Sequence, residues 1–576
     1  MSHKRKASEA WDFADVDAFW ESYKPLTPWG KDEAQARTVL SDRSLIESRY
    51  DDIEAAMSFM KNKADDASVL DRVSYHLRRM PRLSLEVKAS YELLELFQIK
   101  KFMANYRGLV STMSDGVAGR FGLVRLASGS ASFILASELD RGGSDPETFY
   151  LSDVYDQSLA EARVAVGLAD AVMANERIKS EAEARLSFGV SFDGREFVVV
   201  QKDTARTMMS ACGASQLGFA VEPYDNERYI VRILPTPSAL DAMSERELHL
   251  AAERVAEARV LARISTLASD AMPELRVAVA ATTRWDRARA GADLAITLGM
   301  CRPMLASTTM RLEKACYLPC ANECYKMGLS YAALTADFSA GAVVLFGSNM
   351  GGKTVVLKSL LFFQLLAQAG LFVPAERFET RVYASIQYVG ELSGERFVGL
   401  SGFGLELWRL IAARASAAAD DSGKGGTLVA FDELARTTGS HEASALLSAV
   451  VEAYASPESS CKGDRAFFAT HFHGVARVPG AEYRRMKGLD KEAATAALNM
   501  HSLERTAIGD SIPGDASPAD AALAKRLAGI NRYMRYEVVD DDGSGTESDA
   551  LAIASFLGLD SRIIERARFY LTKDGV

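Results

Sequence analysis

The sequence has few cysteines, no long apolar run and no excess of basic residues. Six cysteines in 576 residues are too few for the disulfide scaffold on which small secreted domains depend. No stretch approaches the roughly 20 apolar residues that a membrane-spanning helix needs. The basic start of the chain is not followed by the apolar segment of a secretory signal. We therefore expect a soluble, cytoplasmic protein without a membrane partner.

The charge balance is acidic. The chain carries 67 Lys and Arg against 77 Asp and Glu, a formal net charge of -10. Proteins that bind the phosphate backbone of nucleic acids usually carry a basic surplus or at least a basic stripe. The composition therefore lowers the expectation of DNA binding, although it does not exclude a locally basic groove. The length is sufficient for about three or four domains.

Hydrophobic periodicity divides the N-terminal half. Residues 1–23 are polar and aromatic and are expected to form a loosely attached arm. Helical periodicity fills residues 24–190 and returns in 241–294, whereas 191–240 contain two alternating, strand-like runs, REFVVVQK and ERYIVRILP. A small β element between two long helical regions indicates an extended helical lever that carries a β tip.

The strongest chemical signal is a phosphate-binding loop in the C-terminal half. GSNMGGKT fits G-x-x-x-x-G-K-[ST] and stands between an apolar strand and an apolar helix. Its glycines let backbone N–H groups converge on phosphates, and the helix N-terminus adds positive potential. The fold expected is multidomain: the all-α lever and its β tip, then an α/β P-loop NTPase domain over 295–576. The expected ATP-binding residues are Gly347, Ser348, Asn349, Met350, Gly351, Gly352, Lys353 and Thr354.

Acidic residues and a histidine at the ends of two further apolar runs complete a hydrolytic set. LVAF ends in Asp432 and Glu433, and AFFAT ends in His471. We expect Thr354 and Asp432 to coordinate Mg²⁺ and Glu433 to orient or deprotonate the attacking water. His471 is expected to stabilise the γ-phosphate, with a purely structural histidine as the alternative. His473 completes an H-x-H pair, but no third ligand accompanies it, so a metal role is not expected.

Three further features have no firm interpretation. Cys316, Cys320 and Cys324 are spaced by four residues, and a metal or cluster site on one helix face is conceivable. This spacing is not a common zinc pattern, and half-buried structural cysteines are favoured. Tyr331 and Phe338 are the candidates for stacking on adenine. Segment 485–535 contains helical pieces and a PGDASP linker, and it is a candidate for a partner-specific lid.

At these motifs the sequence resembles the MutS family, over roughly residues 20–576. GSNMGGKT is similar to that family's P-loop, GLFVPAE (370–376) to the segment after it, and FDELARTTGSHEA (431–443) to its Walker B motif and D-loop. SGFGLEL (401–407) resembles the signature stretch, with Ser401, Phe403 and Glu406 matching. Residues 548–567 are similar to the closing segment. The resemblance implies an ABC-type ATP hydrolase with a clamp at the β tip. It also implies a homodimer, joined in part by residues 548–571, in which Ser401 completes the partner's ATP site.

The sequence departs from the family at two points, and these departures leave two functions of the chain open. No mismatch-reading domain is expected, and ARTT (435–438) replaces the usual Gly-Arg-Gly-Thr of the D-loop, which would restrict the backbone there. One hypothesis is a DNA-binding clamp ATPase related to mismatch repair or recombination. The alternative is a chaperone-like ATPase that reactivates a cobalamin-dependent amino acid aminomutase of the lysine or ornithine type. A nucleotide-gated scaffold without hydrolysis is disfavoured by the intact motifs.

Overall fold

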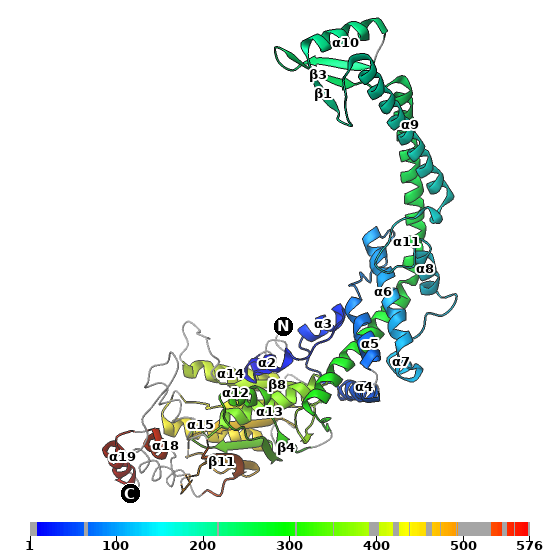
Figure 1. Cartoon of the computed structure of the whole chain (residues 1–576). Helices are drawn as coiled ribbons and strands as arrows, with labels where there is room; N and C mark the ends of the chain where they lie inside the picture. Colours follow the sequence, from blue (N-terminus) through cyan, green and yellow to red (C-terminus); the bar gives the residue numbers. More distant parts are fainter. Residues whose placement is uncertain are drawn as a thin grey trace. The chain divides into compact units, whose positions relative to one another are not determined.

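The computed structural model describes residues 9–62, 67–215, 218–305, 308–348, 351–390, 402–418, 426–436, 438–456, 463–472, 474–490, 492–493, 532–543, 550–557 and 559–573. The chain forms two compact units, one of Met1–Leu70 with Thr283–Val576 and one of Asp71–Thr282 (Figure 1). Each unit is described by itself. Among the residues described, no helix combines the length and the apolar character that crossing a membrane requires.

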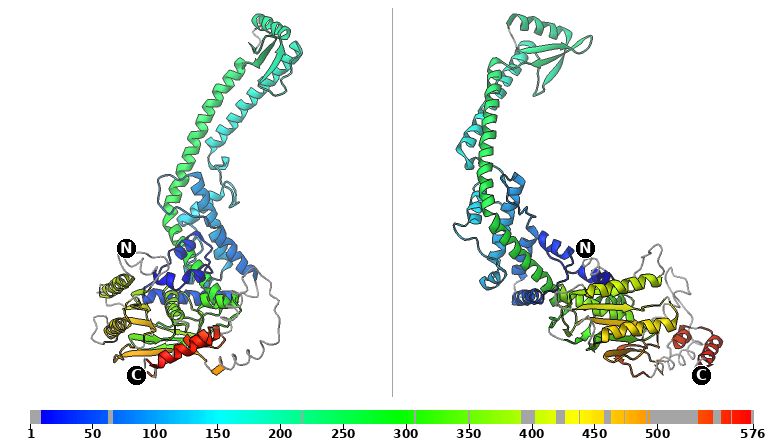
Figure 2. Two further views of the ribbon diagram at one scale, coloured as in Figure 1. Left: turned by 90° about the vertical axis from the view of Figure 1, so that its left-hand side faces the viewer. Right: turned by 180° about the vertical axis from the view of Figure 1, so that it is seen from behind.

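The unit of Asp71–Thr282 is built mainly from helices. α9 (Gln157–Phe188) and α11 (Pro237–Leu298), whose last part belongs to the other unit, lie side by side (Figure 2). Arg163 of α9 bonds to Glu253 and Glu257 of α11, both at 2.8 Å. Few α9 side chains are buried, and several of these are small. The contact between α9 and α11 therefore depends on the close approach of the two helices and on ion pairs more than on a broad apolar core. The other elements described are α5 (Ala67–Arg79), α6 (Leu93–Thr112), α7 (Asp115–Phe121), α8 (Ala131–Asp140) and the 3₁₀ helix η1 (Asp153–Tyr155).

A small β element lies between α9 and α11 in the sequence. It contains β1 (Phe197–Gln201), α10 (Lys202–Ser215), β2 (Phe219–Pro223) and β3 (Arg228–Ile233). The strands form an antiparallel sheet of order β1-β3-β2, and α10 covers one face (Figure 1). Met208 of α10 is buried with Val231 and Phe219 in the small core of this face. The opposite face stays open.

In the unit of Met1–Leu70 with Thr283–Val576, the N-terminal segment contains α2 (Val16–Trp20), α3 (Pro28–Gln35) and α4 (Arg43–Asn62) and packs on the C-terminal part. Phe13 stacks on Tyr388 with ring centroids 3.7 Å apart, and Phe19 meets Phe362 edge to face at 5.5 Å. Asp15 accepts hydrogen bonds from Tyr317 at 2.8 Å and Lys358 at 2.6 Å. The expectation of a loosely attached arm is therefore wrong for residues 9–23, because the side chains of Trp11, Phe13, Phe19 and Tyr23 are buried.

A six-stranded sheet forms the centre of this unit, in the order β12-β11-β6-β10-β9-β8. All neighbouring strands are parallel except β12, which is antiparallel to β11. α15 (Ser440–Ala455) packs on one face in a cluster with apolar residues of β6, β9 and β10. α13 (Lys353–Gln368) contributes no residue to that cluster. It contacts β9 and β10 on the opposite face of the sheet. The strands are β6 (Ala342–Phe346), β8 (Ser385–Val389), β9 (Thr427–Asp432), β10 (Arg465–Thr470), β11 (Ala481–Leu489) and β12 (Met534–Asp540).

Smaller elements surround the sheet. β4 (Met310–Ala315), β5 (Leu334–Phe338) and β7 (Arg377–Glu379) form a second, antiparallel sheet. The remaining helices described are α12 (Leu318–Lys326), α14 (Gly402–Ala418), α18 (Ala550–Leu557) and α19 (Ser561–Lys573). The unit of Met1–Leu70 with Thr283–Val576 is therefore an α/β structure with mixed sheets, whereas the unit of Asp71–Thr282 is mainly helical.

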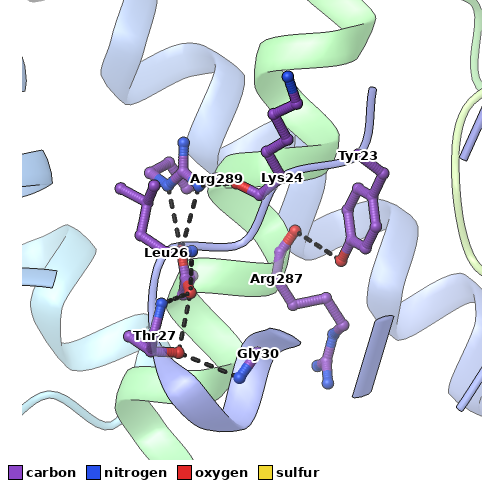
Figure 3. A network of polar contacts seen from close by, with 8 residues as sticks. Tyr23, Lys24, Leu26, Thr27, Gly30, Arg287 and Arg289 are labelled. Carbon is purple, nitrogen blue, oxygen red and sulfur yellow. Dashed lines mark hydrogen bonds and ion pairs between the residues drawn. The ribbon is translucent and has the colours of Figure 1, made fainter. Parts of the chain in front are cut away.

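A buried carboxylate fastens the N-terminal segment to α11. Asp286 is fully buried and accepts hydrogen bonds from the Leu26 N–H at 2.8 Å, the Thr27 N–H at 2.7 Å and the Thr27 hydroxyl at 2.8 Å. Arg289 adds an ion pair at 3.2 Å (Figure 3). The Thr27 hydroxyl also caps α3 by accepting from the Gly30 N–H at 3.1 Å. One carboxylate thus supports both the start of α3 and its attachment.

Asp286→Ala should destabilise this unit by about 3 kcal/mol, because it leaves the N–H groups of Leu26 and Thr27 without an acceptor and removes the ion pair of Arg289. Thermal and urea unfolding would measure the change. Asp337→Ala is the matched control, since the Asp337 side chain is 68% exposed. Equal stability of the two variants would contradict the role given to Asp286.

Candidate nucleotide site

The phosphate-binding loop follows β6 and leads into α13. Gly352 precedes the helix with φ of 91°, and a Cβ there would approach the Tyr536 ring to 3.0 Å, so only glycine fits without strain. The Lys353 ammonium is buried and donates to the carbonyls of Gly347 at 2.7 Å and Ser348 at 2.9 Å. Burial lowers the pKa of Lys353, and the nearby carboxylates oppose that shift. Asn349 and Met350 lie outside the described residues.

The carboxylates expected to complete the site lie directly opposite this loop. The Thr354 hydroxyl donates to Asp432 at 3.1 Å, which joins the start of α13 to the end of β9. Burial raises the pKa of Asp432, and the neighbouring Glu433 acts in the same direction. His471, after β10, places Nδ1 3.6 Å from the Glu433 carboxylate. The structure therefore brings Lys353, Thr354, Asp432, Glu433 and His471 together, whereas Ser401 and His473 lie outside the described residues.

The donors present fit a nucleotide phosphate with Mg²⁺. Within the described part of the chain, the buried Ser348 hydroxyl and His471 Nδ1 have no hydrogen-bond partner. Buried polar atoms are normally satisfied, and both flank the loop where a phosphate would lie. A threonine hydroxyl beside an aspartate offers the oxygen ligands that Mg²⁺ prefers.

A cavity of about 280 Å³ adjoins the loop. Tyr331 lines it and accepts a hydrogen bond from the Tyr317 N–H at 2.8 Å. Phe338 does not line the cavity; it is buried against Phe467 with ring centroids 5.1 Å apart. Of the two aromatic candidates, only Tyr331 thus borders this space. Tyr536 of β12 also lines it, and no sequence motif marked that residue.

Comparison with known proteins agrees with this geometry. Residues 343–573 match the model of MutS domain V. The similarity to this MutS family model thus lies in residues 343–573, less than half of the chain. It is 27% identical over 338 residues, 58% of its length, to the DNA mismatch repair protein MSH3 of Chaetomium globosum. It is 28% identical over 260 residues, 44% of its length, to DNA mismatch repair protein MutS of Symbiobacterium thermophilum, and 30% identical over 235 residues, 39% of its length, to that of Paracoccus denitrificans. The matches span 27%, 28% and 26% of these relatives, little more than a quarter of each.

The segment that resembles the D-loop of the MutS family is held in an unusual conformation. Ala435 has a φ of 65° and Glu433 a φ of 51°, a left-handed backbone that costs non-glycine residues roughly 1–2 kcal/mol. The Ala435 N–H donates to the Glu406 carboxylate of α14 at 2.9 Å. This bond ties the segment resembling the family's signature to the turn after β9. Ala435 thus adopts the conformation that a glycine would take without strain.

The three cysteines do not share one helix face. Cys316 precedes α12, so it does not share a helix face with Cys320 and Cys324. Among the described residues, no three His, Cys, Asp or Glu side chains are placed to hold a metal ion. Cys320 and Cys324 line the cavity beside the loop, and burial raises the pKa of Cys320 to about 11.

Asp432→Asn should stabilise the nucleotide-free protein at pH 7 and weaken Mg²⁺ binding at least about tenfold. Because the folded-state pKa of Asp432 is raised, its favourable contribution is complete below the unfolded pKa near 3.8 and is lost as pH rises through the folded value. The stability advantage of the variant should therefore shrink as pH falls. Thermal unfolding from pH 4 to 8 with Mg²⁺ titration measures both effects. Asp337→Asn is the exposed control, and an identical pH profile for both variants would contradict the prediction.

Proposed function

We propose that this protein binds ATP with Mg²⁺ at the loop of residues 347–354 and hydrolyses it. The observation that carries the proposal is the 3.1 Å bond between the Thr354 hydroxyl and Asp432, which joins the two motifs that P-loop NTPases use to hold Mg²⁺. The buried Lys353 ammonium, the unsatisfied Ser348 hydroxyl and the adjoining cavity support the same ligand.

Each side chain has a distinct role in this proposal. Lys353 exchanges its two carbonyl acceptors for phosphate oxygens, while Thr354 and Asp432 hold the metal. Bound Mg²⁺ supplies positive charge to the phosphates. Glu433 orients or deprotonates the attacking water, and His471 stabilises the γ-phosphate from the next strand. The adenine lies in the cavity against Tyr331, with Tyr536 at its border.

Lys353→Ala should abolish ATP binding, whereas Glu433→Gln should bind ATP and hydrolyse it at least about 100-fold more slowly. Nucleotide titration and phosphate release measure the two steps separately. Lys326→Ala is the matched control, because the Lys326 side chain is 69% exposed. Wild-type hydrolysis by Glu433→Gln would show that another group activates the water.

For the biological role, we propose a homodimeric clamp ATPase that acts on DNA in mismatch repair or recombination. In this proposal residues 24–190 and 241–294 form the lever, 191–240 the clamp tip and 295–576 the ATPase domain. Residues 548–571 contribute to the dimer, and Ser401 completes the ATP site of the partner. The names of the MutS and MSH3 relatives support the DNA-associated role. The comparisons give no support to the aminomutase-reactivase alternative, which the DNA experiment below still addresses.

The open face of the β1-β3-β2 sheet is the surface proposed to meet DNA. Phe197 and Val199 alternate outward along β1 and are 46% and 41% exposed. In the register of the sheet, Phe197 lies opposite Arg232 and Gln201 opposite Arg228. Arg228 is already paired with Asp225 at 2.7 Å. Arg232 is therefore the better candidate for a phosphate contact.

Arg232→Glu should lower DNA affinity roughly tenfold. It should also reduce the slope of log affinity against log salt concentration by the amount of about one phosphate contact. Binding to duplex, branched and single-stranded DNA across a salt series measures this. Arg206→Glu, on the helix that covers the other face and 66% exposed, is the charge-matched control. Absence of DNA binding by the wild-type protein at low salt would contradict the clamp proposal and favour a protein partner.

A further inference from the structure

A second cavity, of about 130 Å³, lies in the unit of Met1–Leu70 with Thr283–Val576. A water molecule needs about 10–15 Å³ on the same measure, so the space accepts a group of several non-hydrogen atoms. Its wall combines aromatic rings, two guanidinium groups and one carboxylate. The lining residues that bear on its chemistry are Trp20, Tyr23, Glu33, Thr38, Arg49 and Arg287.

The cavity holds more positive charge than its own carboxylate balances. Arg287 pairs with Glu33 at 3.1 Å, whereas Arg49 donates from Nη1 to the Ala369 carbonyl at 2.9 Å. The Arg49 Nε is buried and has no hydrogen-bond partner among the described residues. Burial lowers the pKa of Arg49, and the nearby Arg287 lowers it further. Asp52 also lies near Arg49, but its carboxylate is already bonded to Arg284. The two guanidinium groups of the cavity wall therefore share the single carboxylate of Glu33.

The surroundings keep this arrangement in place. Gly370 has a φ of 80°, and a Cβ there would come within 2.4 Å of the Arg49 side chain. Tyr23 is buried and donates from its hydroxyl to the Arg287 carbonyl at 3.4 Å. Figure 3 shows that contact, with the Arg287 side chain extending away from the hydrogen bonds of Thr27. The Arg287 guanidinium is therefore free of the Asp286 network and available to the cavity.

We propose that this cavity binds a small oxyanion, a phosphate or a carboxylate group, between Arg49 and Arg287. Both guanidiniums are planar forks that match such oxygens in a bidentate manner. The anion satisfies the Arg49 Nε and balances the net charge of the three ionic side chains. Trp20, Tyr23 and Thr38 supply an apolar and a hydroxyl wall for the remainder of the ligand. This site is separate from the phosphate-binding loop and does not depend on ATP binding there.

Calorimetric titration of the full chain with inorganic phosphate and with acetate, at constant ionic strength with chloride as reference, tests the site. Glu33→Gln removes the competing carboxylate and should tighten anion binding about threefold to tenfold. Arg287→Gln should weaken it at least about tenfold. Opposite effects of two neutralising substitutions cannot come from general destabilisation. Arg43→Gln, on the same helix as Arg49 but 58% exposed and outside the cavity, should bind as the wild type does.

Repeating the titrations with saturating ADP separates this site from the phosphate-binding loop. Binding at the proposed cavity persists with ADP and keeps its dependence on Glu33. Preference for phosphate or for acetate identifies which oxyanion the site takes. The proposal is overturned if neither anion binds at millimolar concentration, or if Glu33→Gln binds as the wild type does. Loss of all phosphate binding on adding ADP, with acetate inert, would also overturn it.

Discussion

The parallel register of β6, β10 and β9 is the constraint on which the candidate site depends. Phe346 lies opposite Thr470, and Ala469 lies opposite Asp432, so the three strands end at one edge of the sheet. Residues after their carboxyl ends therefore meet, as is general for ligand sites in open α/β sheets. The strands are buried on both faces, which fixes their register, because a slip would place polar strand ends in the core.

The position of α13, which starts at the phosphate-binding loop, is fixed by its packing in the rest of the unit. The helix begins at the phosphate-binding loop, and nearly all its later residues are buried. Phe362 on this helix contacts Phe19 of the N-terminal segment and Tyr317, both edge to face. The segment is in turn fastened to α11 through Asp286. Residues far apart in the sequence thus fix the helix that presents Lys353 and Thr354.

The sequence is sufficient to predict the parts of the site that short motifs encode. The loop of 347–354, Asp432, Glu433 and His471 each follow a buried strand, and the structure brings their described members together. No short motif in the sequence marks the contacts that depend on the pairing of strands far apart in the chain. Tyr536 reaches the cavity only because β12 pairs with β11, and Tyr331 rather than Phe338 borders it because β5 turns Phe338 into the core. The packing of residues 9–23 likewise depends on partners more than 300 positions away.

Charge acts locally in this protein, and the net value of -10 says little about either site. The dipole of α13 favours anions at its N-terminus and cations at its C-terminus. The loop offers N–H groups and Lys353 at one end, and Arg49 donates to the Ala369 carbonyl at the other. An oxyanion at the Arg49 Nε leaves the Nη1 bond to the Ala369 carbonyl in place, so that Arg49 lies between the anion and this end of the helix. The two proposed sites therefore lie at opposite ends of α13, where the helix dipole has opposite signs.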